Sequence, residues 1–339
     1  MAELDKRRRK LRAADVALAQ TLARHYGTAW QRIRAKLDRL LDRVEAAKVR
    51  GETVDVGWLA QHRVAEHLEQ VSLAELRTYV DFAERKINKA ALDAFLAGRI
   101  DAQALIRSSL PPGFKFNTFD PSLPVRQLEK LYGATRQGAP LRGLLDQLGA
   151  EQANRARGLL VEGVAVGKGP REIARTLRDS FGGDQVKALR VARTEVIRAY
   201  RRASHSSYRQ HSDVVGGWVW VASLDARTCG ICLGMHGTEH SLDEELDSHV
   251  SCRCSPAPLT RSWSELGFGD IPETRVDVGS GEDWFAEQPE SVQRTVLGPG
   301  KLAEYKAGRL KLADLPQPTV DPVWGPGLRE KPLRDLVTV

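Results

Sequence analysis

The sequence predicts a mainly α-helical protein, built as a multi-helix bundle with a small zinc-stabilised β-containing subdomain and an extended C-terminal tail. Three observations predict this fold class. Only 6% of the 339 residues are aromatic, whereas Arg, Leu and Ala are abundant, which favours helices over a β-sandwich or barrel. Apolar residues recur every three or four positions over long stretches. All four cysteines lie between positions 229 and 254, which indicates a local metal site.

The N-terminal part reads as a series of helices. One amphipathic stripe over residues 11–50 contains Leu22, Tyr26, Trp30, Ile33 and Leu37, and it predicts a single long helix. Two further helices are expected at residues 56–70 and 73–97. Residues 109–124 hold four prolines and three phenylalanines, so no helix can continue through them. We therefore expect a basic N-terminal helical region at residues 1–108 and a Pro/Phe-rich linker at residues 109–124.

Helical patterns resume after the linker, at residues 125–132, 140–162, 171–180 and 185–210, which predicts a central helical domain at residues 125–215. Trp218-Val219-Trp220-Val221 then alternates as a short strand does, at the start of a zinc-binding β subdomain at residues 216–258. Residues 259–339 form a loop-rich C-terminal region with short helices near 290–296 and 301–307. Five prolines between positions 316 and 339 predict the extended tail.

The positive charge is concentrated near the N-terminus. The net charge is +7, and the first 50 residues hold 14 Lys/Arg against 6 Asp/Glu. A second basic surface is expected on the helix at 185–210. Clustered cations attract DNA phosphates or an acidic protein surface without reading base sequence, although a solvated helix face gives the same pattern. The candidate contacts to DNA phosphates or to an acidic protein surface are Lys6, Arg7, Arg8, Arg9, Lys10, Arg12, Arg198, Arg201 and Arg202.

No membrane partner is expected. The longest apolar stretch, residues 214–224, is far shorter than the ~20 residues that a membrane-spanning helix needs. The first residues are charged and no apolar run follows them, so we expect no signal peptide and synthesis in the cytosol. In that reducing compartment, clustered cysteines favour a metal site over disulfides.

The strongest motif is Cys-x2-Cys-x16-His-x2-Cys-x-Cys, from Cys229 to Cys254. Cys229 with Cys232, and His249 with Cys252, have the two-residue gap that lets both side chains bind one tetrahedral zinc ion. Cys254 is a candidate substitute ligand, and His236 or His240 could compete. Reduced thiols without metal, or disulfides, are the alternatives. Because four protein ligands leave no open position to activate water, a structural Zn²⁺ and no enzymatic activity are expected.

Several motifs in order resemble the phage Mu F-type minor head proteins of the phage head morphogenesis family. They are Ala192-Arg-Thr-Glu195, Trp220, Asp225-Ala-Arg-Thr-Cys-Gly-Ile-Cys232, Gly237 and His249-Val-Ser-Cys-Arg-Cys254. The resemblance covers about residues 145–258, and weakly 297–315. One departure is Leu246-Asp-Ser before His249, where the family usually has prolines.

The resemblance implies a minor head (capsid) protein that acts in head morphogenesis and DNA packaging. Its implied partners are the portal protein, procapsid or capsid proteins and, non-specifically, DNA. Its implied location is the virion, in the head interior or at the portal vertex, and the host cytoplasm during assembly.

Two other classes of protein could use the same cysteine pairs. A zinc-stabilised nuclease of the His-Asn-His (HNH) type would need His240 as its first catalytic histidine. No histidine follows His249 to complete a second metal site, which argues against it. A zinc-ribbon regulator would read specific DNA, but helix-turn-helix and Cys2His2 finger spacings are absent from the sequence.

Overall fold

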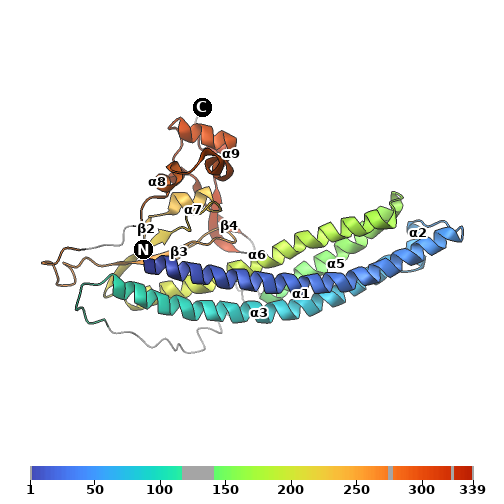
Figure 1. Ribbon diagram of the computed structural model, residues 1–339, viewed down its shortest axis with the longest axis horizontal. Coiled ribbons are helices and arrows are strands. Elements are labelled where there is room, and N and C mark those ends of the chain that lie inside the picture. The colour runs from blue at the N-terminus through green and yellow to red at the C-terminus, as the bar shows by residue number, and fades with distance from the viewer. Residues whose placement is uncertain (1, 117–140, 274–277, 322–323, 338–339) are drawn as a thin grey trace. The chain divides into compact units, whose positions relative to one another are not determined.

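A computed structural model describes residues 2–116, 141–273, 278–321 and 324–337. Over these residues the protein is mainly helical with small sheets, as predicted (Figure 1). The helix expected at residues 125–132 and most of the Pro/Phe-rich linker lie outside the described residues.

The long helices follow the apolar periodicity, but they break elsewhere than expected. They are α1 (Ala2–Val49), α2 (Val56–Gln61), α3 (Val64–Ser108), α5 (Leu141–Ala165) and α6 (Pro170–Gln210). The break expected near residue 71 lies instead at Arg63, which has a φ of 51°. The two helices expected at 171–180 and 185–210 are one helix, since α6 continues through Gly182 and Gly183. Each glycine costs a helix about 1 kcal/mol relative to alanine. Next to them, buried Phe181 packs against Trp30 of α1 with ring centroids 4.6 Å apart.

The described chain forms two compact units. Among the described residues, the helical unit comprises 15–90 and 141–193, and the mixed unit comprises 2–14, 91–116 and the described residues from 194 onward. The helices α1, α3 and α6 therefore each supply residues to both units. The five-part division expected from the sequence remains a prediction.

Aromatic and aliphatic packing holds the helical unit together. Tyr26 of α1 meets Tyr79 of α3 edge to face with ring centroids 5.0 Å apart. Arg142 of α5 forms ion pairs with Asp81 and Glu84 of α3 at 2.5 and 3.3 Å. These ion pairs are partly exposed and contribute little beside the apolar burial.

The mixed unit contains a three-stranded antiparallel sheet in the order β2-β1-β3. Its central strand β1 (Val215–Val221) pairs with β2 (Glu239–Ser241) and β3 (Ser255–Thr260), and the helix α7 (Gly230–Met235) lies between β1 and β2 in the chain. The indole of Trp218 is fully buried, in a core that also includes Trp220, Cys232 and Cys252. The cysteines thus belong to the main core of this unit.

The C-terminal part is more ordered than an unpaired tail. It contains α8 (Gly281–Ala286), α9 (Glu290–Lys306), η1 (Leu312–Asp314), β4 (Pro316–Asp321), β5 (Gly325–Glu330) and η2 (Leu333–Asp335). α9 is kinked at Gly298, where φ is 71°, so it corresponds to the two short helices expected. The tail is extended as predicted, but β4 and β5 pair as an antiparallel hairpin instead of running alone. Across the described residues, every helix is too short or too polar to span a bilayer.

Candidate metal centre

A turn after β1 places the first pair of cysteines. The hydroxyl of Thr228 accepts a hydrogen bond from the backbone N–H of Asp225 at 3.0 Å, and the Asp225 carboxylate accepts one from the N–H of Arg227 at 2.9 Å. Cys229 follows as the residue before α7, and Cys232 lies in the first turn of this short helix. Both sulfurs therefore emerge on one side of a tight turn.

A second turn places His249 and Cys252. The N–H of Cys252 donates to the carbonyl of His249 at 3.2 Å, and Ser251 between them has a φ of 62°. The guanidinium of Arg253 donates two hydrogen bonds to the Asp225 carboxylate, at 2.6 and 2.8 Å. This bidentate pair joins the two turns and, through the Arg253 guanidinium, lowers the pKa of Asp225.

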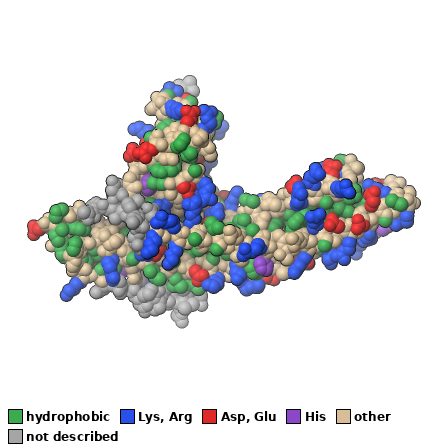
Figure 2. Space-filling view, viewed as in Figure 1, with side chains coloured by type: hydrophobic (Ala, Val, Ile, Leu, Met, Phe, Trp, Pro, Cys, Tyr) green, Lys and Arg blue, Asp and Glu red, His purple; other side chains and the backbone are tan. Residues whose placement is uncertain are grey.

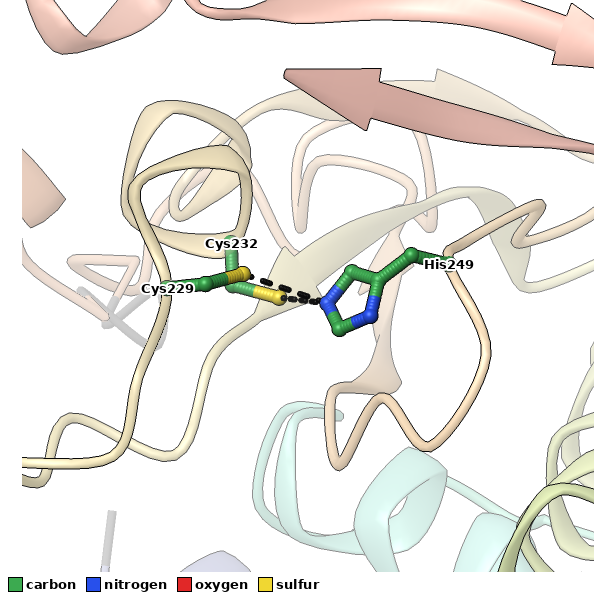
Figure 3. A group of neighbouring side chains, drawn as sticks. All are labelled: Cys229, Cys232 and His249. Carbon is green, nitrogen blue, oxygen red and sulfur yellow. Dashed lines mark hydrogen bonds between the residues drawn. The ribbon is translucent and has the colours of Figure 1, made fainter. Parts of the chain in front are cut away.

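The two turns bring five potential ligands together. The Nε2 atom of His249 lies 3.2 Å from the Cys229 sulfur and 3.3 Å from the Cys232 sulfur (Figure 3). The sulfurs of Cys232 and Cys252 are 3.5 Å apart. Two groups could hold a metal ion, Cys229 with Cys232 and His249, and Cys232 with Cys252 and Cys254, so Cys232 belongs to both.

The arrangement fits a tetrahedral ion. With Zn–S bonds of about 2.3 Å, tetrahedral geometry separates two ligand sulfurs by about 3.8 Å, a few tenths of an ångström more than the spacing here. A cavity of about 40 Å³ lies among the sulfurs and the imidazole. The second ring nitrogen of His249, Nδ1, is 2.9 Å from the carbonyl of Val250, the contact that metal-binding histidines typically make. Nδ1 would carry the proton, and Nε2 faces the sulfurs as a ligand must.

The close contacts within the cluster shift the pKa values of its side chains even without an ion. Hydrogen bonds from Cys232 and His249 lower the pKa of Cys229 to about 5. Desolvation opposes charge on His249, but its contacts with Cys229 and Cys252 outweigh this and raise its pKa to about 11. Burial raises the pKa of Cys254 well above its ordinary value.

The two competing histidines are placed elsewhere. His236 is buried, with Nδ1 accepting from the N–H of Ala222 at 3.0 Å and Nε2 lying 2.9 Å from the carbonyl of Val278. His240 stacks on Trp218 with centroids 4.2 Å apart, and its Nδ1 lies 2.9 Å from the Glu244 carboxylate. Within the described residues neither histidine belongs to a potential metal group. The nuclease hypothesis therefore has no metal cluster at His240 in this part of the chain.

The nine basic candidates divide into four partly buried arginines whose side chains bond to other parts of the protein, and five residues that are half-buried or exposed. Arg7 pairs with Asp101, Arg8 donates to the carbonyl of Ala222, and Arg198 pairs with buried Glu195. Arg201 donates to the carbonyls of Cys254 and Cys252 in the ligand loop, residues 249–254. Arg202 is half-buried, and Lys6, Arg9, Lys10 and Arg12 are exposed, the last 3.0 Å from Asp225. In Figure 2 the Lys and Arg side chains are spread along the long helices with acidic side chains among them.

These contacts define a class, a mainly helical protein with a Cys/His cluster that could hold a metal ion. Residues 154–257 match the family model described as Phage Mu protein F like protein. The matched stretch contains all of α6, β1 and β2, the start of β3 and all five potential ligands. The resemblance expected from the motifs is thus confirmed over this stretch. Comparisons with curated proteins and with solved structures find no match.

Sequence reasoning missed the contacts that support the cluster. Asp225 lies four residues before the Cys/His motif and Arg253 lies within it, but nothing in the spacing shows that their side chains meet. Glu195, in the Ala-Arg-Thr-Glu motif, is 6% exposed and has one carboxylate oxygen without a hydrogen bond. Desolvation raises its pKa to about 7 despite the charges of Arg198 and Arg202.

The titration of Glu195 makes stability depend on pH. Because its pKa is higher in the folded than in the unfolded chain, folding is penalised once pH rises above the unfolded value and fully penalised above about 7. Between pH 4.5 and pH 8, the free energy of unfolding of the wild type should fall by about 3 kcal/mol relative to that of Glu195→Gln. Urea unfolding of both proteins across this range measures the difference, in which effects of the cysteine cluster cancel. A difference independent of pH would contradict this assignment.

Proposed function

We propose that this protein is a phage minor head protein that acts in head morphogenesis and DNA packaging, in the virion and, during assembly, in the host cytoplasm. The observation that carries the proposal is the family match over residues 154–257, which includes the cluster and the helix that contacts it. Its partners would be the portal protein and procapsid or capsid proteins. The test is co-sedimentation with procapsids assembled from the portal and capsid proteins of the same phage. Protein that stays in the supernatant would count against it.

The cluster would hold one structural Zn²⁺ through Cys229, Cys232, His249 and Cys252. The support is the geometry of the two turns, with the sulfurs and Nε2 spaced 3.2 to 3.5 Å around a small cavity. Zinc with four protein ligands would link the turn after β1 to the loop before β3 and add folding free energy to the mixed unit. The proposal gives the protein no enzymatic role.

The exposed basic residues of α1 would bind DNA phosphates without base specificity. Lys6, Arg9 and Lys10 are all exposed and close in sequence on one helix. Reversing all three to Glu should weaken binding to random-sequence duplex at least about tenfold, and lower the salt slope by about 0.9 for each phosphate that the variant no longer neutralises. Binding is measured by fluorescence anisotropy over a salt series.

The matched control reverses the same number of exposed charges further along α1, at Lys36, Arg39 and Arg43. This variant should bind DNA nearly as the wild type does. Equal losses in both variants would mean that only net charge matters, and the N-terminal surface would then have no particular role.

A further inference from the structure

Arg201 of α6 points at the ligand loop. Its Nε donates to the carbonyl of Cys254 at 2.8 Å, and a terminal nitrogen donates to the carbonyl of Cys252 at 3.1 Å. These two residues flank Arg253, so one planar guanidinium holds the peptide groups on both sides of it. Two hydrogen bonds from a rigid fork fix orientation in a way that a lysine ammonium does not.

Two cysteines of this segment, Cys252 and Cys254, could each supply the fourth metal ligand. Cys252 and Cys254 both lie within reach of Cys232, and both are buried. In an extended backbone, residues two positions apart project to the same side, so a modest rotation of the intervening peptides decides which sulfur faces the ion. The backbone N–H of Cys254 donates to the Cys252 sulfur at 3.4 Å, a contact that suits a metal-bound thiolate on Cys252.

A second contact from α6 fixes the other end of the loop. The hydroxyl of Thr194 accepts a hydrogen bond from the N–H of Ser251 at 3.1 Å. Thr194 and Arg201 are seven residues apart, so they lie on one face of the helix. The backbone on either side of Cys252 is thus attached to one rigid element, while Arg201 also places a positive charge beside a cluster that is anionic when three thiolates bind Zn²⁺.

We propose that Arg201 is a positioning residue that selects Cys252 over Cys254 as the fourth metal ligand. The proposal rests on the metal centre proposed above and deepens it. Arg201 itself binds no metal. It acts by holding the carbonyls of Cys252 and Cys254, and removing it leaves both sulfurs able to approach the ion.

The experiment titrates Co²⁺ and then Zn²⁺ into the full chain and records the absorption bands of tetrahedral thiolate-bound Co²⁺. Cys254→Ser should bind Co²⁺ and Zn²⁺ with wild-type affinity. Cys252→Ser should bind both ions more than about 100-fold more weakly than the wild type. Arg201→Gln should weaken metal binding by about 10- to 100-fold, the range for residues that orient ligands. In the Arg201→Gln background, the affinity difference between the two cysteine variants should shrink. Arg201→Lys should not restore wild-type affinity.

The matched control is Arg209→Gln, an exposed arginine in the last turn of the same helix, which should bind metal as the wild type does. Equal affinities of Arg201→Gln and Arg209→Gln would overturn the proposal, and so would equal losses in Cys252→Ser and Cys254→Ser with Arg201 intact. The cysteine comparison holds even if Arg201→Gln does not fold. Absence of metal binding by the wild type would instead refute the metal centre itself.

Discussion

Cys232→Ser is expected to abolish zinc binding and destabilise the mixed unit. Cys232 is the one cysteine common to both potential metal groups of the described chain, so its loss breaks either ligand set. The wild type should carry one zinc ion per chain, and the variant should lose more than about 100-fold in affinity, beyond the loss typical of residues that only orient ligands. Elemental analysis gives the stoichiometry, and hydrogen exchange should show loss of amide protection in β1 and α7.

The control for this variant is His240→Gln, because His240 lies on strand β2 of the same sheet but outside both potential metal groups of the described chain. It should retain zinc at the wild-type stoichiometry. Retention of tightly bound zinc by Cys232→Ser would refute the proposed ligand set. Metal-dependent cleavage of plasmid DNA that disappears in His240→Gln would instead revive the nuclease alternative.

Trp218→Ala should produce the largest loss of stability from packing alone. Trp218 is fully buried on β1, donates from its indole N–H to the carbonyl of Glu244 at 3.0 Å, and stacks on His240. Truncating a buried tryptophan leaves a cavity and typically costs about 3–5 kcal/mol. The free energy of unfolding from urea titration, followed by hydrogen exchange at the sheet, measures this cost.

Two comparisons sharpen the interpretation of Trp218→Ala. Trp218→Phe should lose less, since it keeps most of the apolar area, and half-buried Trp284→Ala on α8 should lose less still. Because Cys232 and Cys252 belong to the same core, Trp218→Ala should also release zinc at lower urea concentration than the wild type. A loss below about 1 kcal/mol would mean that this core contributes little to the unit.

The helical fold class could be predicted because helix periodicity is a local property. Residues three or four positions apart share a face in any helix, so the stripe through Leu22, Tyr26 and Ile33 required no knowledge of what covers it. Break points were less predictable, since α6 continues through Gly182 and Gly183 although glycine has low helix propensity. The hairpin of β4 and β5 was missed because proline content shows where helices cannot form and not which strands pair.

The sequence by itself determined the helical fold class and the residue types of the potential metal ligands, since the gaps between Cys229 and Cys232 and between His249 and Cys252 are short enough to fix geometry locally. Only the tertiary structure decided which side chains support the cluster. Arg201 is 51 positions from Cys252 and Arg253 is 28 from Asp225, so these pairs meet only when α6 and the two turns pack together. The sequence presented Arg201 as a candidate for contact with DNA or a partner protein, whereas in the tertiary structure its guanidinium donates to the carbonyls of Cys252 and Cys254. Whether a side chain on a basic helix faces solvent or the protein interior depends on which other elements pack against that helix. The spacing of residues along the chain does not specify this packing.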